Sequence, residues 1–271
     1  MKNLVVIFFL QLAFSFQGYT QRDSSFALIT SIKGDIQHFT VDNMDNLYIL
    51  SSTDQLKKLD ANGDSIAVFN NVKRFGKLST IDVSNPLKIL LYYKDYNSIV
   101  ILDRLLNVRH TINLPSQGIY QVSAIGQSYD GKVWIYDVLE NKLKKINEEG
   151  KLLLETPDFR QLFEEAPQPQ QIFDQDGLVY LYDSIRGFFV FDYYGTLKNR
   201  IPYTGWQNIA ITSGYIIATK DNRLQRYQVN SFALKDDEIP VHFLPYDHML
   251  FSGSKIYAQS QNLIRIFKLP E

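Results

Sequence analysis

Residues 46–64 are NLYILSSTDQLKKLDANGD, and this stretch decides the fold because versions of it return along most of the chain. Two runs of strand-forming residues flank a polar turn, and the second run ends in Asp-x-x-Gly. The glycine, Gly63, supplies the positive φ that a tight hairpin needs. The stretch therefore predicts a β-meander, in which neighbouring strands are joined by short turns.

The other copies of this unit recur at intervals of roughly 40 residues. Their strands are rich in β-branched and aromatic residues, such as VWIY at 133–136, and lack the 3.6-residue apolar spacing of helices. This period and composition predict an all-β fold, the β-propeller, with one copy in each four-stranded blade. The copies span residues 91–103, 134–147, 180–192, 217–228 and 257–268.

The sequence predicts a six-bladed β-propeller closed by an N-terminal strand. The last copy has three plausible strands before Glu271, whereas residues 26–32 form a strand with no partner in their own blade. Pairing the two completes the last blade and removes two exposed sheet edges. We expect a single domain over residues 21–271, with blades at 36–69, 78–114, 121–155, 169–201, 206–235, and 247–269 plus 26–32.

Residues 1–20 have the pattern of a secretory signal peptide: Lys2, an apolar run over 4–16, and small residues at 18–20. The run is too short for a spanning helix, which needs about 20 apolar residues. The chain has no cysteine, so neither a disulfide nor a lipid-anchoring cysteine is expected. We expect a bacterial protein that is periplasmic or secreted, and soluble without membrane insertion after cleavage.

Charge argues against polyanionic partners. The 28 Lys and Arg residues balance 29 Asp and Glu residues, which leaves no field of one sign to attract nucleic acid or an anionic membrane. No sequence signal indicates the oligomeric state.

The motif search predicts no catalytic residue, no cofactor and no metal site. The sequence has no Gly-rich phosphate loop, no G-x-S-x-G elbow and no Cys/His cluster at metal spacing. Of the four histidines, His38 and His248 are expected near the starts of innermost strands in neighbouring blades. With Asp247 nearby they could bind a metal, but no third ligand is evident.

The segment Asp60–Asp64 superficially resembles a calcium-binding loop. An EF-hand loop ends in an acidic residue at position twelve, where this chain has Asn71. Asx-x-x-Gly also recurs at 147–150 and 192–195, which favours hairpin turns.

Two linkers between blades stand out. Residues 70–77 form a basic turn in which Phe75 either contacts a partner or packs against a neighbouring blade. Residues 156–170 form the longest linker, and 158–165 are expected to be a short helix capped by Asp158 and ended by Pro167. Insertions of this size are often functional, although packing over a blade edge is the alternative.

The repeated pattern of an aromatic strand, a turn and Leu-x-x-Leu/Ile-Asp-x-x-Gly resembles the exported six-bladed propellers of the NHL and YncE-like type. The resemblance covers nearly all of the mature chain and implies the fold, but not one activity, since such propellers include binding scaffolds, lactonases and lyases. The related calcium-dependent lactonases have acidic and amide ligands around the central channel. The corresponding zone here is mixed and partly apolar: His38, Ile81, Ala124, Gln170, Gln207 and Asp247.

A narrower resemblance covers one blade, at residues 82–93 and 99–103. It is similar to small periplasmic propellers of gliding and anaerobic gut or oral bacteria, some of them associated with the type IX secretion translocon. This resemblance implies an accessory role in the envelope and assigns no binding residues.

We therefore favour a non-catalytic protein-interaction module of the cell envelope over a channel-site hydrolase or lyase and over a glycan or small-ligand binder. In propellers of the resembled family, ligands approach the face that carries the blade connections and the turns between second and third strands. Aromatic and Arg residues dominate interface energetics. The expected partner-binding residues on this face are Lys73, Arg74, Phe75, Tyr96, Tyr120, Phe159, Phe163, Arg186, Tyr203, Trp206 and Tyr246. We expect the opposite face, with turns such as 61–63 and 148–150, to offer few such residues.

Overall fold

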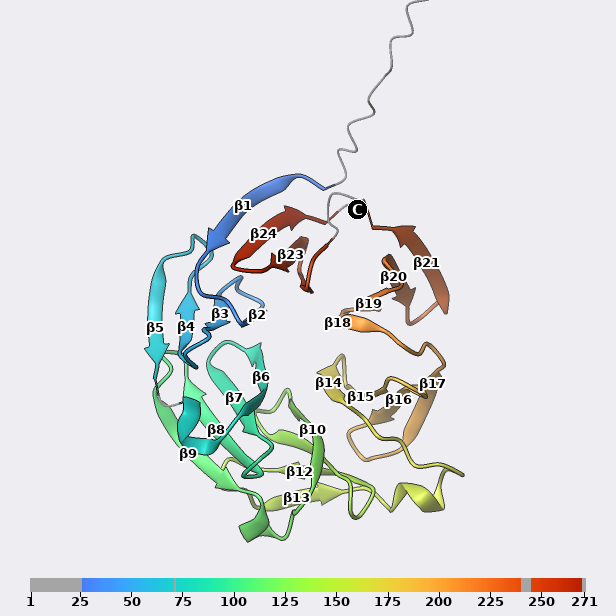
Figure 1. Ribbon diagram of the computed structural model, residues 1–271. Coiled ribbons are helices and arrows are strands. Elements are labelled where there is room, and N and C mark those ends of the chain that lie inside the picture. Colours follow the sequence, from blue (N-terminus) through green and yellow to red (C-terminus); the bar gives the residue numbers. More distant parts are fainter. Residues whose placement is uncertain (1–25, 71, 240–244, 270–271) are drawn as a thin grey trace, which may run out of the picture.

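The computed structural model describes residues 26–70, 72–239 and 245–269. Six four-stranded antiparallel sheets form a ring around a central axis (Figure 1). Blade 1 contains β2 (His38–Val41), β3 (Leu47–Leu50), β4 (Leu56–Leu59) and β5 (Ser65–Phe69). Blade 2 contains β6 (Leu78–Asn85), β7 (Lys88–Tyr93), β8 (Ser98–Asp103) and β9 (Val108–Asn113). Blade 3 contains β10 (Val122–Gln127), β11 (Val133–Asp137), β12 (Lys142–Ile146) and β13 (Leu152–Glu155). Blade 4 contains β14 (Gln171–Gln175), β15 (Leu178–Asp183), β16 (Gly187–Asp192) and β17 (Leu197–Ile201). Blade 5 contains β18 (Gln207–Thr212), β19 (Tyr215–Lys220), β20 (Arg223–Gln228) and β21 (Ala233–Glu238). Blade 6 contains β22 (His248–Ser252), β23 (Lys255–Ser260) and β24 (Leu263–Lys268) together with β1 (Leu28–Lys33).

The N-terminal strand closes the ring, which confirms the predicted architecture. Strand β1 pairs antiparallel with β24, with Ile32 opposite Ile264 and Ser31 opposite Arg265. The Lys268 amide also donates to the Ala27 carbonyl at 2.9 Å. The first described strand and the last therefore share one sheet, whose order is β22, β23, β24, β1.

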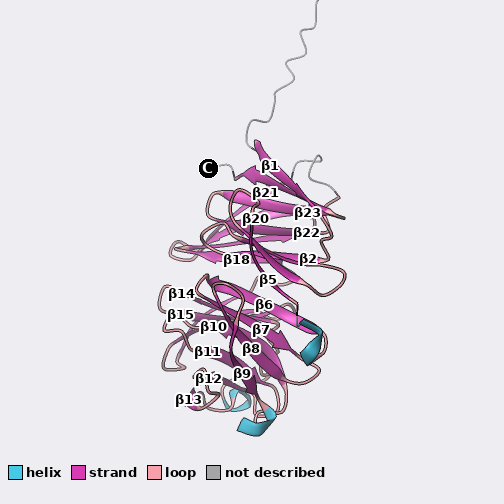
Figure 2. Ribbon diagram, turned by 90° about the vertical axis from the view of Figure 1, so that its left-hand side faces the viewer, coloured by secondary structure: helices cyan, strands magenta, loops and turns pink. Residues whose placement is uncertain are grey.

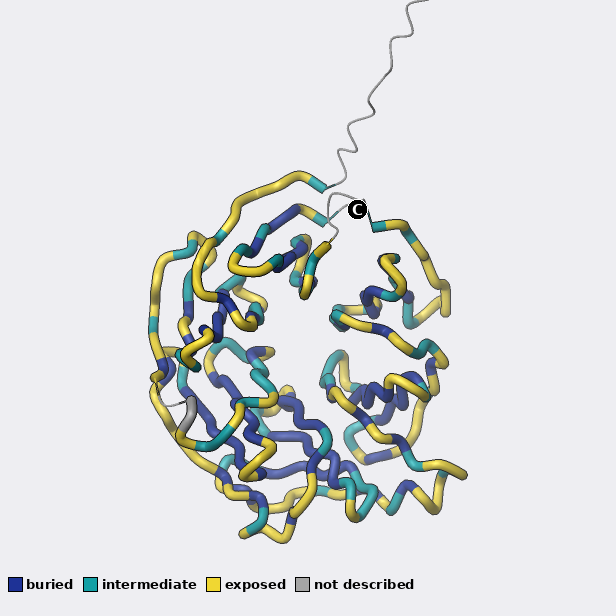
Figure 3. Tube along the Cα trace, viewed as in Figure 1, coloured by how far each residue is buried: buried dark blue, intermediate teal, exposed yellow. Residues whose placement is uncertain are grey.

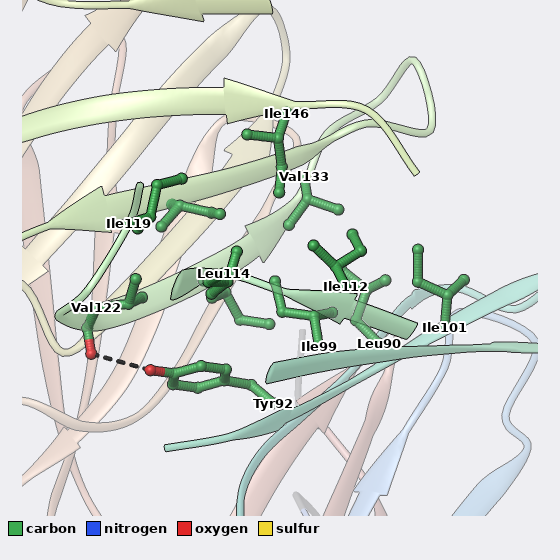
Figure 4. Close-up of a cluster of buried hydrophobic side chains, with 12 residues drawn as sticks. Leu90, Tyr92, Ile99, Ile101, Ile112, Leu114, Ile119, Val122, Val133 and Ile146 are labelled. Carbon is green, nitrogen blue, oxygen red and sulfur yellow. Dashed lines mark hydrogen bonds between the residues drawn. The ribbon is translucent and has the colours of Figure 1, made fainter. Parts of the chain in front are cut away.

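The core lies between the blades. In β15, Val179 and Leu181 belong to the cluster shared with blade 3, whereas Tyr180 and Tyr182 belong to the cluster shared with blade 5. Successive side chains of a strand point to opposite faces, so a middle strand between two neighbours needs apolar residues throughout. This requirement explains unbroken apolar runs such as LVYLY at 178–182. Figure 4 shows the equivalent cluster between blades 2 and 3, where Tyr92 donates to the Val122 carbonyl at 3.2 Å.

The outermost strands of the blades are largely exposed, as β1, β9 and β21 show in the burial pattern of Figure 3. Burial therefore decreases from the middle strands to the rim of the ring.

The Asp-x-x-Gly segments are hairpin turns, as predicted. The Asp60 carboxylate accepts hydrogen bonds from the amides of Asn62 and Asp64, both at 2.9 Å. Gly63 has a φ of 92°, which a residue with a side chain rarely adopts. The carboxylate thus organises the turn itself.

The ring has two faces with different connections. The connection face carries the segments between blades and the turns between second and third strands; the turn face carries the remaining turns. Asp35, before β2, accepts hydrogen bonds from Ser52 in the β3–β4 turn, at 3.1 Å from its amide and 2.8 Å from its hydroxyl. A connection between blades and a turn between second and third strands therefore meet on one face. Figure 2 shows the ring from the side.

The linker between blades 3 and 4 holds a shorter helix than predicted. Instead of spanning 158–165, the 3-10 helix η3 covers Phe159–Gln161, and Asp158 caps it by accepting from the Arg160 amide at 2.9 Å. Phe159 is buried, but Leu162 is 51% exposed, so a longer helix would gain no second buried residue at that position. The other 3-10 helices, η1 (Val72–Phe75) and η2 (Pro115–Gln117), also lie in blade connections.

Across the described ranges, no helix combines the length and apolar character needed to cross a membrane. The expected signal peptide, residues 1–20, lies outside the described residues.

Candidate functional site

Three of the predicted partner-binding residues are exposed on the connection face. Tyr96 lies in the β7–β8 turn and is 62% exposed, and Tyr120 precedes β10 and is 65% exposed. Arg74, in η1, is also exposed, with its guanidinium 5.5 Å from the centre of the Phe75 ring. These side chains can contact a partner without rearrangement. The side chain of Lys73 lies outside the description.

Two predicted anchors are instead core residues. Phe159 is fully buried and stacks on Phe191, with ring centres 4.9 Å apart. Trp206 is 3% exposed and packs between blades 4 and 5. Neither ring leaves surface for a partner, so both are excluded from the candidate site.

The remaining predicted residues are half-buried. Phe75 packs on Tyr93 at 5.3 Å, which confirms the packing interpretation of this linker. Arg186 forms ion pairs with Asp183, at 3.2 Å, and with Glu165. The other three, Phe163, Tyr203 and Tyr246, pack against the interfaces between blades 3 and 4, 4 and 5, and 5 and 6, respectively.

Three exposed aliphatic residues on the same face were not predicted from the sequence: Leu139, Leu162 and Ile185, which are 54%, 51% and 77% exposed. Their placement follows from the local sequence. In the β15–β16 turn, Asp183 accepts hydrogen bonds from the amides of Ile185 and Arg186, at 2.8 and 3.1 Å. The carboxylate fills the inside of the turn and leaves the Ile185 side chain outside.

Gly187 completes this turn. Its φ is 83°, and a β-carbon there would lie 2.2 Å from the Ile201 carbonyl oxygen, so only glycine fits. Asp137 organises the β11–β12 turn around Leu139 in the same way, accepting from the Leu139 amide at 3.0 Å. We call Tyr96, Tyr120, Leu139, Leu162 and Ile185 the connection-face set.

The two histidines singled out from the sequence do meet, because closure makes their blades neighbours. The rings of His38 and His248 lie 5.1 Å apart at the starts of β2 and β22. His248 Nε2 is buried without a hydrogen-bond partner, and burial followed by the His38 charge lowers the pKa of His248 to about 4. Desolvation also lowers the pKa of His38.

The carboxylate of Asp247 accepts a hydrogen bond from the Gln261 amide at 2.9 Å, and this bond does not connect it to the two histidines. Within the described residues, no group of three His, Cys, Asp or Glu side chains is arranged to hold a metal ion.

The turn face carries a groove that the sequence analysis did not anticipate. A pocket of about 430 Å³ lies between blades 3 and 4 and is lined by Tyr129, Asp174, Gln175, Asp176, Gly177 and Tyr193. The rings of Tyr129 and Tyr193 stack with centres 4.7 Å apart and planes 10° apart. Tyr129 is 71% exposed. We call this pocket the turn-face groove.

Asp174 holds the groove together. Its carboxylate accepts hydrogen bonds from Trp134 Nε1 at 2.8 Å, the Ser128 hydroxyl at 2.9 Å and the Tyr193 hydroxyl at 2.6 Å. Burial and this bond to Asp174 raise the pKa of Tyr193. The turns of two blades are therefore fixed to one another.

The expectation that the turn face offers few anchors is wrong. In the Asx-x-x-Gly turns, Tyr193 occupies the position that Ala61 and Glu148 hold in the turns at 60–64 and 147–151. Met44, Leu87, Tyr194 and Phe232 on this face are also more than 60% exposed, at 64%, 61%, 86% and 65%. Aromatic residues inside Asp/Gly-rich turns were the sequence signal that could have revealed the groove.

The fold and these sites define a six-bladed β-propeller with candidate surfaces on both faces. No protein-family model and no curated protein matches the chain.

Solved structures of low sequence identity share the fold. An inactive variant of virginiamycin B lyase from Staphylococcus aureus has a TM-score of 0.58 at 12% identity, over 89% of this chain and 99% of the lyase. The Pan2 WD40 domain of Neurospora crassa has a TM-score of 0.63 at 10% identity, over 92% of this chain and 97% of that domain. PorZ of Porphyromonas gingivalis has a TM-score of 0.58 at 9% identity, over 85% of this chain and 30% of PorZ. These similarities establish the fold alone, and the neighbours include both enzymes and interaction modules.

Proposed function

We propose that this protein is a non-catalytic propeller that binds a partner protein of the bacterial cell envelope through its connection face. The observation that carries the proposal is the connection-face set. Its five large side chains project from three consecutive blades and are 51–77% exposed. Loops held on a rigid scaffold are where propellers and other β domains commonly place binding residues.

The turns that present two of these residues, Leu139 and Ile185, are preorganised. The carboxylates of Asp137 and Asp183 fix the backbone around Leu139 and Ile185, so these side chains lose little backbone freedom on binding. Single exposed apolar residues are ordinary, so the proposal depends on five of them being presented on one face by three consecutive blades. Arg74 and Arg186 add charged groups on the same face.

The envelope location rests on different support. The expected signal peptide favours export, and PorZ is described as an essential bacterial surface component of the type IX secretion system. An accessory role in such a secretion machine accords with the resemblance of residues 82–103 to small periplasmic propellers.

A second candidate is a channel-site lyase or hydrolase, and the His38–His248 pair is the observation that favours it. The virginiamycin B lyase neighbour is a catalytically inactive variant in which alanine replaces a histidine, so that propeller depends on an imidazole. Here two imidazoles lie 5.1 Å apart at the starts of the first strands of neighbouring blades, and Nε2 of His248 is buried without a hydrogen-bond partner. Titratable groups whose pKa values are perturbed by their surroundings gather at catalytic sites.

Capture from the native envelope in mild detergent tests the proposal. We expect the double variant Tyr96→Ala with Ile185→Ala to capture the partner at least tenfold less well, because truncating true interface anchors costs about 2 kcal/mol or more. The matched control is Met44→Ala with Leu87→Ala, which removes equally exposed residues from the turn face. All variants should melt like the wild type, because the truncated side chains project into solvent.

The outcomes separate the two candidates. Normal capture by the connection-face variant and lost capture by the turn-face control would contradict the proposal. The double variant His38→Asn with His248→Asn should capture the partner and function normally. Loss of function in that variant while it remains folded would instead support the lyase or hydrolase.

A further inference from the structure

The turn-face groove lies on the opposite side of the ring from the proposed partner surface and has its own chemistry. Three hairpins build it: Tyr129 comes from the β10–β11 turn, residues 174–177 from the end of β14 and the β14–β15 turn, and Tyr193 from the β16–β17 turn. Its volume of about 430 Å³ falls at the lower end of the range for small-ligand pockets. A single side chain or a small molecule fits this space better than a folded surface does.

The charge lining the groove is negative. Asp174 and Asp176 line it, and no lysine or arginine does so among the described residues. The nearby ammonium of Lys145 does not line the groove; its side chain is 10% exposed, and Asp130 pairs with it at 2.9 Å. Gln175 Nε2 donates to the Asp176 carboxylate at 2.9 Å and orients it at the rim. The groove therefore favours a cationic ligand over an anionic one.

The aromatic rings already accommodate a cation. Lys145 Nζ lies 4.9 Å from the centre of the Trp134 ring and 5.4 Å from the centres of both Tyr129 and Tyr193. The Tyr193 hydroxyl donates to a carboxylate at 2.6 Å, which makes its ring more electron-rich. Tyr129 remains 71% exposed, so ring surface is available to a second cation from solvent.

We propose that the turn-face groove binds the guanidinium group of an arginine side chain presented by a peptide. A planar guanidinium stacks flat on an exposed ring and donates two hydrogen bonds to one carboxylate. Tyr129 supplies the ring, and Asp176 supplies the carboxylate at the rim. Asp174 also lines the groove and contributes negative charge, while its oxygens accept hydrogen bonds from Trp134 and Tyr193. The site is independent of the connection-face set, so either can fail without the other.

The two tryptophans of the chain allow a direct test. The indole N–H of Trp134 bonds to Asp174 beside the groove, whereas Trp206 is buried between blades 4 and 5 and provides an internal reference. The probe is the peptide acetyl-Gly-Arg-Gly-amide, titrated into ¹⁵N-labelled protein at low salt. We expect a saturable shift of the Trp134 indole signal and none of the Trp206 signal.

Five controls identify the recognised group. The neutral isostere, with citrulline in place of arginine, should bind at least tenfold more weakly, and added salt should weaken the arginine peptide. Tyr129→Ala and Asp176→Asn should each lower the affinity about fivefold or more. Tyr194→Ala, next to the groove but outside its lining, should stay within twofold of the wild type.

Three results would overturn the assignment. They are the absence of a saturable Trp134 shift, equal affinity for the citrulline peptide, and binding of a neutral saccharide such as methyl β-glucoside in place of the arginine peptide. The last result would identify the stacked tyrosines as a sugar platform.

Discussion

A chain that begins at residue 34 is expected to aggregate or misfold, whereas one that begins at residue 26 is expected to fold without aggregation. The deletion removes β1, the fourth strand of blade 6. It exposes the edge of β24, whose unpaired backbone groups can pair with another chain. It also removes Phe26 and Ile32 from the hydrophobic clusters on either side of blade 6. The loss should consume most of the stability of about 5–15 kcal/mol that is typical of a domain.

Light scattering after size exclusion, together with thermal melting, measures this effect. Both chains lack the segment before residue 26, so their comparison isolates the closing strand. A monomeric protein with an unchanged melting temperature after loss of residues 26–33 would contradict ring closure by β1.

Acidification is expected to destabilise the protein through His248. Burial lowers the pKa of this imidazole from 6.5 to about 4 in the folded state. The unfolded chain therefore binds the proton more tightly, and stability is lost as pH falls from 6.5 towards 4. The shift corresponds to a loss of about 3 kcal/mol from this residue at the acid end.

Urea unfolding at several pH values, compared with His248→Gln, checks this expectation. The variant lacks the titrating group, so its free energy of unfolding should fall less steeply across this window. Parallel pH profiles of the wild type and His248→Gln would contradict the buried, unpartnered state of this ring.

The fold was predictable because the strands and turns of each blade are determined by residues close together in the sequence. Strand, turn and Asp-x-x-Gly signals recur in every strong copy, and the unpartnered segment 26–32 matched the one blade that lacked a strand. The helix at 158–165 was overestimated because its extent depends on tertiary burial. Phe159 enters the core between blades, whereas Leu162 faces solvent.

The candidate site was less predictable, since an aromatic residue in a linker can either project into solvent or pack into the core between blades. Tyr120 projects while Trp206 is buried, and the choice depends on the neighbouring blade. Ile185 was missed because its exposure comes from a turn organised by Asp183. The groove was missed because Tyr129 and Tyr193 are distant in sequence and meet only when blades 3 and 4 pack together.

Site-specific photocrosslinking in the native envelope tests most directly whether a partner docks on the connection face. A photoreactive residue is placed at Tyr120 or Ile185, and in parallel at Met44 or Phe232 on the turn face, all of which are at least 64% exposed. We predict that positions 120 and 185 crosslink to one discrete protein and that positions 44 and 232 do not. Crosslinking of that protein only from positions 44 and 232 would contradict the assignment of the partner surface.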